Sequence, residues 1–332
     1  MKGSSGAIVG PSPAAVEYAN AGLMAASCAA ACAMPFQVFL LAYVVLGPLH
    51  YLTEIAWLRE RRYFTSVRGD AFWLGAFAVL ASLAAFVPAA RPYSAWTLSV
   101  GVFSAVGVAI LRAPGGALAL AGYMGAVLLL SAGRPFEALV AAALIPTFVH
   151  VFAFTGLFIL AGALKDRRPS AALGLAVFAA CAVVCVLAPA GAAAVGPRTA
   201  SAFKAGGFEF VHHALYGLLF RARLDPERLF ADPRSAAIAR LTAFAYTYHY
   251  LNWFSKTTII RWHEVGARSI ALSVAGWAAA VGLYAWNYAF GIAALSVLSM
   301  LHVMLELPLD AVTAANVARG LLARGARGPA SC

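Results

Sequence analysis

Four histidines lie inside long apolar segments of the chain, where an ionisable side chain is costly to bury. They are His50, His150, His249 and His302. Neutral imidazoles are good metal ligands, and four that meet at one point would bind Fe, Zn, Cu or Ni. A single histidine in a membrane helix often only donates a hydrogen bond to its neighbour. The metal hypothesis therefore requires that the helices bring all four to one depth.

Two of these histidines are followed by a glutamate four residues later, as His50 by Glu54 and His302 by Glu306. Residues four apart lie on one helix face. Each carboxylate can therefore join the metal, or hold the second nitrogen of its histidine and so fix the tautomer. Glu54 has a second interpretation, which is a salt bridge with Arg59 or Arg62 at the end of its helix.

The amino-acid composition indicates the kind of protein in which these residues lie. Of 332 residues, 63% are apolar and 11% are charged, and the mean hydropathy is +0.82. A soluble domain carries about 45–50% apolar and about 25% charged residues, so a water-soluble globule is excluded. The 24 Lys and Arg residues outnumber the 13 Asp and Glu residues, but they lie in short loops. That distribution indicates membrane topology and not nucleic-acid binding.

The apolar runs predict an all-α polytopic membrane bundle, because roughly 20 helical residues cross a hydrocarbon core of about 30 Å. We expect about nine crossings within one transmembrane domain over residues 35–310, near 36–58, 71–90, 94–111, 115–132, 136–164, 171–196, 235–260, 269–286 and 288–309. The apolar segment Phe208–Phe220 is too short to cross and is expected to be re-entrant or interfacial. Residues 1–34 are expected to form a tail or amphipathic segment, and residues 311–332 a basic C-terminal tail.

Basic residues follow the first, fifth, seventh and ninth expected spans. The positive-inside rule places these ends, and the C-terminus, in the cytoplasm, and we expect a bacterial inner membrane. All four histidines lie on these odd-numbered spans, about 8–14 residues before the cytoplasmic end, which is roughly 12–21 Å deep at 1.5 Å per residue. The four imidazoles can therefore share one layer.

Aromatic residues beside two of the histidines are expected to line a pocket for a long apolar substrate, or else to pack between helices: Tyr248, Tyr250, Trp253, Phe152 and Phe154. Three polar residues of the short segment are weaker ligand candidates and are better placed at a lid or pocket mouth: Glu209, His212 and His213. His263 is interpreted as a solvated loop residue, and Lys256 as a side chain that reaches toward the interface.

Two pairs of cysteines, Cys28 with Cys32 and Cys181 with Cys185, are each one helical turn apart. Because CxxC and CxxH spacings are absent, they indicate neither a zinc ribbon nor a disulfide framework. We interpret them as small apolar core residues. Motifs for covalent haem and for nucleotide cofactors are also absent from the sequence.

Four short windows resemble one known family. The window Gly47–Glu54 resembles the Gly-Leu-Pro-His-Gly-x-x-Asp motif of the Brp/Blh membrane β-carotene 15,15′-dioxygenases, and Leu301–Glu306 resembles their C-terminal Pro-His-x-x-x-x-Asp segment. His150 with Phe152 is similar to their internal histidine followed by an aromatic residue. The region from Tyr248 to Trp262 falls where their third histidine region lies.

The resemblance implies non-haem Fe(II) bound by the four histidines, which would cleave a carotenoid with O2. Two differences from the motifs of this family argue against a full match. Trp253 stands where the family has a second histidine in its third region, and the acids here are glutamates instead of aspartates.

We therefore expect a membrane-embedded iron oxygenase or oxidase that acts on a carotenoid, isoprenoid or other lipid, with Glu54 and Glu306 as catalytic or positioning acids. A metal-free transporter or proton-coupled carrier that uses the same residues as a relay is the alternative.

Overall fold

The structure is a computed structural model, and it describes residues 12–65, 67, 69–111, 117–166, 168–189, 195–256 and 266–325. Within these ranges the regular structure is entirely helical, without strands, as the apolar runs predict. His263 lies outside the described residues, as do both extreme ends of the chain.

The helices follow one another with short connections. In chain order they are α1 (Pro13–Ala33), α2 (Pro35–Leu41), the π-helical η1 (Ala42–Leu46), α3 (Gly47–Glu60), the short η2 (Arg62–Phe64), α4 (Asp70–Phe86), the short η3 (Pro88–Tyr93), α5 (Ser94–Leu111), α6 (Ala117–Gly133), α7 (Pro135–Leu144), the π-helical η4 (Ile145–Phe154), α8 (Thr155–Asp166), α9 (Pro169–Leu187), α10 (Pro197–Ala205), α11 (Phe208–Phe220), the short η5 (Pro226–Arg228), α12 (Pro233–Ser255), α14 (Ala267–Trp286) and α15 (Tyr288–Gly325).

Six helical stretches of the described chain are long and apolar enough to cross a membrane, which indicates an integral membrane protein. They are Pro35–Glu60, Ser94–Leu111, Pro135–Asp166, Pro169–Leu187, Ala267–Trp286 and Tyr288–Leu322. Each of the nine expected spans contains a helix. However, α4 and α6 are shorter apolar helices, and α12 is not among the six, so the count of nine stays a prediction.

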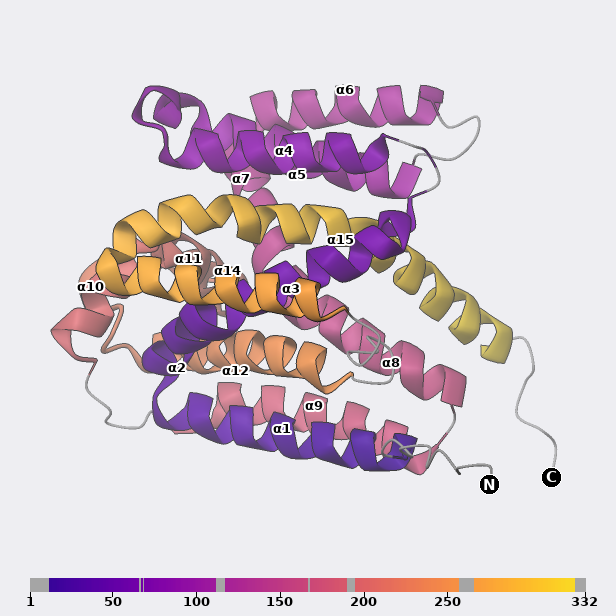
Figure 1. The fold of residues 1–332 in the computed structure, drawn as a ribbon. Coiled ribbons are helices and arrows are strands. Elements are labelled where there is room, and N and C mark those ends of the chain that lie inside the picture. Colours follow the sequence, from indigo (N-terminus) through magenta and orange to yellow (C-terminus); the bar gives the residue numbers. More distant parts are fainter. Residues whose placement is uncertain are drawn as a thin grey trace.

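The helices form a layered bundle (Figure 1). The helices α4, α5 and α6 stack along one side, α1 and α9 lie along the opposite side, and α3, α12, α14 and α15 lie between them. The four helical stretches that carry the histidines, ending in α3, α8, α12 and α15, run in the same sense. This common direction is what the assignment of all four to odd-numbered spans predicts.

The first and last helices reach further than the expected transmembrane domain. Residues 13–33 form α1, which packs on α9 and α12 and buries Met24, Cys28 and Ala31. Near the other end of α1, the Ser255 hydroxyl donates to Asn20 Oδ1 over 2.6 Å. The last helix, α15, continues past residue 310 to Gly325.

Two π-helical segments adjoin the histidines. In η1 the turn is widened, because the backbone N–H of Gly47 donates to the carbonyl of Ala42, five residues earlier. The second segment, η4, contains both Pro146 and His150. Proline has no N–H to donate and clashes with the preceding turn, so Pro48 and Pro146 favour such local widening. Single π-turns, such as the five-residue η1, occur frequently at functional sites.

Candidate metal centre

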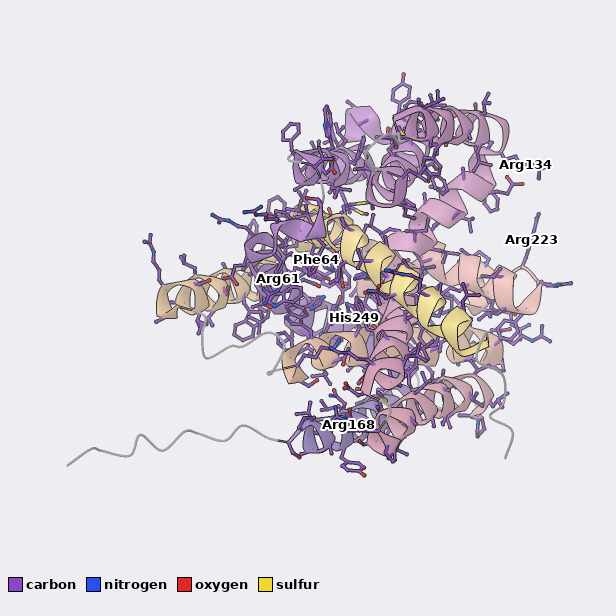
Figure 2. All side chains as sticks on the ribbon, turned by 90° about the vertical axis from the view of Figure 1, so that its right-hand side faces the viewer. Arg61, Phe64, Arg134, Arg168, Arg223 and His249 are labelled. Carbon is purple, nitrogen blue, oxygen red and sulfur yellow. The ribbon has the colours of Figure 1, made fainter. Side chains whose placement is uncertain are left out.

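The four histidines meet in the interior of the bundle. His50 comes from α3, His150 from η4, His249 from α12 and His302 from α15. The ring centroid of His249 lies 4.8 Å from that of His50 and 4.9 Å from that of His150. The His302 ring lies 5.3 Å from His50 and 5.4 Å from His150. Figure 2, viewed from the end where Arg61 and Arg168 lie, places His249 inside the bundle.

Two ring nitrogens face each other at the centre of this cluster. The Nε2 atoms of His50 and His249 are 3.2 Å apart. Two nitrogens bound to one metal at about 2.1 Å would be separated by about 3.0 Å in octahedral and about 3.4 Å in tetrahedral geometry. The observed spacing therefore suits two ligands of one ion as well as it suits a hydrogen bond.

Acidic side chains from two helices line the cluster. Glu54 Oε2 lies 3.0 Å from His50 Nε2. Glu306 Oε2 lies 3.4 Å from His150 Nε2, and Asp310 Oδ2 lies 3.8 Å from His150 Nδ1. All three carboxylates are buried, with side chains at most 5% exposed. One group of ligand atoms, from His50, Glu54 and His302, lies within 4.8 Å of one another.

The structure shows which side chains the two glutamates contact. Glu54 is 1% exposed and faces His50 on its own helix, instead of pairing with Arg59 or Arg62. Glu306 contacts His150 on a different helix, not His302 on its own. The helical spacing places Glu306 and His302 on one face, but the neighbouring η4 supplies the imidazole that reaches the carboxylate.

Several buried polar atoms of the cluster make no hydrogen bond to other described residues. They include both nitrogens of His150 and of His302, Nδ1 of His50, and carboxylate oxygens of Glu54, Glu306 and Asp310. A buried polar atom without a partner costs free energy, and such atoms are rare unless an ion or water satisfies them. These nitrogen lone pairs and carboxylate charges gather in one place, and such an arrangement suits the binding of a cation.

Two residues of the site were not predicted from the sequence. Asp310 continues the four-residue spacing of His302 and Glu306, so a longer search along that helix face would have found it. Thr155 Oγ1 lies 2.9 Å from His249 Nδ1. When His249 Nδ1 donates to Thr155, its Nε2 presents a lone pair to His50, which is the tautomer that binds metal. No spacing in the sequence links these two residues.

A small cavity adjoins the cluster. It has a volume of about 120 Å³ and is bordered by His150 and His302, by residues of η4 and α15, and by aromatic side chains of four elements: Tyr43, Tyr51, Phe208, Tyr246 and Tyr250. The Tyr51 ring stacks on His302 at 4.2 Å, and its hydroxyl lies 2.9 Å from that of Tyr250. This space is large enough for a small molecule such as O2.

Of the five aromatic residues predicted for the pocket, Tyr250 borders this cavity. Phe152 instead stacks on Phe178 at 5.1 Å, and Tyr248 borders a separate surface pocket beside Lys256. Phe154 lies in η4 and is half-buried. Trp253 packs against His50, and its indole N–H donates to Thr53 Oγ1 over 3.0 Å.

The short helix α11 has the predicted bounds and lies beside the cavity, not at the histidine cluster. His212 Nε2 lies 2.7 Å from Ser235 Oγ, and burial lowers the pKa of His212 to about 3. Glu209 lies 3.8 Å from Lys204 Nζ. His212 also borders a second cavity of about 30 Å³, which shares Phe208 with the first.

The donor set limits the kinds of ion that the cluster could hold. Imidazole nitrogens with carboxylate oxygens suit Fe, Zn, Cu or Ni more than hard cations such as Ca²⁺. Comparisons of the chain with protein-family models, with curated proteins and with solved structures find no match. The buried cluster of four histidines and three acids is thus a candidate metal centre.

Proposed function

We propose that this protein is a membrane-embedded non-haem iron oxygenase or oxidase that acts on a lipophilic substrate with O2. The observation that carries the proposal is the meeting of four buried imidazoles from four helices, in which ring nitrogens of His50, His150 and His302 make no hydrogen bond to other described residues. Iron with an open position would activate O2.

Each polar residue has a role in this proposal. His50, His150, His249 and His302 are the metal ligands. Glu54 and Glu306 either complete the ligand set or hold the neighbouring imidazoles. Thr155 fixes the tautomer of His249, and Asp310 orients His150. Trp253 is not a ligand in this proposal, because its indole N–H is engaged by Thr53.

The substrate class follows from the surroundings of the site. The cavity beside the histidines, about 120 Å³, is below the roughly 300–1,000 Å³ of ordinary ligand sites. It accommodates O2 and the reacting part of a chain, while the rest of a carotenoid, isoprenoid or lipid extends beyond it. Phe208 and Tyr246 border both this cavity and the one beside His212. They are the side chains that must move to admit a longer chain, with α11 at the mouth.

Orientation in the membrane is part of the proposal. The C-terminal end of α3, with Arg61, and the N-terminal end of α9, with Arg168, lie at one end of the bundle (Figure 2). The positive-inside rule then assigns that end to the cytoplasm. We propose an inner-membrane protein of a bacterium with nine crossings, an interfacial α11 and a cytoplasmic C-terminus.

Elemental analysis of detergent-purified protein tests the metal assignment. The wild type, reconstituted with ferrous iron under anaerobic conditions, is expected to hold about one iron per chain. His150→Ala and the double variant His50→Ala/His302→Ala are expected to lose it. His213→Ala is the matched control, since this half-buried histidine of α11 is outside the cluster, and it retains iron. Equal iron content in all four proteins would overturn the ligand assignment.

The second candidate is a metal-free, proton-coupled carrier. The placement of His150 between Glu306 and Asp310 favours it, because acid and histidine chains form proton relays in transporters. Substrate flux into proteoliposomes prepared with chelator would support the carrier. Oxygen consumption that depends on iron and on a carotenoid or lipid would support the oxygenase.

A further inference from the structure

Four cysteines gather on two helices that carry none of the four histidine ligands. Cys28 and Cys32 belong to α1, and Cys181 and Cys185 belong to α9. The Sγ atoms of Cys28 and Cys185 are 3.7 Å apart, and the Cys28 thiol donates to the Cys181 carbonyl over 3.6 Å. The Sγ atoms of Cys28, Cys32 and Cys185 all lie within 4.8 Å of one another.

The packing of two helices produces this cluster. Helices α1 and α9 lie side by side and run in the same sense (Figure 1). Each carries two cysteines four residues apart, and that spacing places them on one face. Cys28 and Cys185 are almost fully buried, whereas Cys32 is half-buried. Two short stripes of thiols therefore face each other across the interface.

The sulfur spacing suits a metal better than a disulfide. A disulfide needs sulfur atoms about 2.05 Å apart, and the four thiols are free in the structure. Thiolates bound to one ion at about 2.3 Å are separated by about 3.8 Å in tetrahedral and about 4.0 Å in trigonal geometry. The 3.7 Å between Cys28 and Cys185 is close to the first of these values.

A buried cation beside the thiols is an independent indication. Arg240 of α12 is 2% exposed. Its Nε donates to the Cys185 carbonyl over 2.7 Å, and its Nη2 donates to the Ala188 carbonyl over 2.8 Å. Among the described residues, no carboxylate forms an ion pair with Arg240.

A buried charge without an opposite charge nearby is costly, so a negatively charged group beside the Arg240 guanidinium would stabilise the protein. Three thiolates around a divalent ion carry a net charge of minus one, and around a monovalent ion minus two. Either cluster would complement Arg240, which interacts electrostatically with Cys32.

We propose that Cys28, Cys32 and Cys185 bind a thiophilic metal ion, Zn²⁺ or Cu⁺, and that this second metal site joins α1 to α9. Each thiol loses its proton to solution when the ion binds. The site is independent of the histidine cluster and of the reaction proposed there. A thiolate site of this kind is structural, because its ligands come from two packed helices.

The test uses the full chain purified in detergent with reductant. Elemental analysis identifies zinc or copper, and substitution with Co²⁺ gives a sulfur-to-metal charge-transfer absorption if thiolates bind it. We expect about one equivalent of metal and this absorption in the wild type. Cys185→Ser and Cys32→Ser are expected to lose both, and Cys332→Ser, the matched control at a cysteine that the proposal does not use, keeps both.

Two controls separate metal loss at the cysteines from changes at the histidine site and from misfolding. His50→Ala is expected to retain the charge-transfer absorption, because its residue belongs to the other centre. Unchanged elution in size-exclusion chromatography identifies the cysteine variants that remain folded. A wild type that gives no such absorption with Co²⁺ and binds no Cu⁺ overturns the proposal. So does a Cys28–Cys185 disulfide found by mass spectrometry of unreduced, alkylated protein.

Discussion

The Nε2 atoms of His50 and His249 lie 3.2 Å apart, although 199 residues separate them along the chain. They face each other across the contact between α3 and α12. Each ring also has a second partner, because Glu54 lies beside His50 and Thr155 holds Nδ1 of His249. Two imidazole nitrogens that face one another must share either a proton or a cation. This pair is therefore the most direct place to detect a bound metal.

Asp310 is expected to strengthen metal binding through His150. Its carboxylate lies 3.8 Å from His150 Nδ1 and is 1% exposed, so Asp310→Asn removes the charge that orients the imidazole. Such positioning acids contribute about 10- to 100-fold to metal affinity. Competition with a chelator of known affinity measures the change. Glu137→Gln, an exposed acid of α7, should leave the affinity unaltered, and an equally unaltered Asp310→Asn would remove Asp310 from the site.

Trp253 is expected to contribute to stability and not to metal binding. Trp253→Phe removes the hydrogen bond from the indole N–H to Thr53 Oγ1 and should lower the free energy of unfolding by about 1 kcal/mol. Iron content should stay at the wild-type level. Thermal unfolding in detergent and elemental analysis measure the two quantities. Trp286→Phe, at an exposed position, should change neither, and loss of iron in Trp253→Phe would show that the indole supports the metal directly.

Gly47 leaves room for the paired tyrosines beside His302. A Cβ at this position would lie 2.8 Å from the Tyr51 hydroxyl oxygen and 3.4 Å from that of Tyr250. These two hydroxyls are hydrogen-bonded and buried, so Gly47→Ala should destabilise the protein by about 1–3 kcal/mol through overpacking. Gly22→Ala in α1 is the matched control, since nothing lies within 4 Å of its Cβ. Gly22→Ala should stabilise the protein by up to about 1 kcal/mol, because alanine is the better helix former. A neutral Gly47→Ala in thermal unfolding would contradict the tight contact.

His212 is expected to make the protein sensitive to acid. Burial lowers its pKa to about 3, with a further lowering by His213 and an opposing effect of Asp232. The folded state therefore keeps His212 neutral, while the unfolded chain binds a proton below its ordinary pKa of 6.5. Stability is thus complete above pH 6.5 and falls as the pH drops toward 3, by about 2 kcal/mol at pH 5.

His212→Gln should remove this part of the pH dependence, which thermal unfolding at pH 7 and pH 5 measures. His213→Gln changes a half-buried side chain and should retain it. If both variants kept the wild-type difference between the two pH values, the acid sensitivity would have another source.

The apolar runs alone determined that the described chain is helical and where its main helices lie. They also placed α11 at Phe208–Phe220. The spacing of His50 and Glu54 was sufficient to put those side chains in contact, because residues four apart share a face in any helix. The common direction of the histidine-bearing helices follows from the alternation of long apolar spans.

Only the tertiary structure decided which faces meet. Hydropathy does not fix how a helix is rotated about its axis when apolar residues surround it, so the contact of Glu306 with His150 could not be read from the sequence. For the same reason, the sequence could not predict the contact of Tyr51 with His302 or that of Cys28 with Cys185. Such pairs depend on how helices from distant parts of the chain pack, and that packing is set by the whole core rather than by any local pattern.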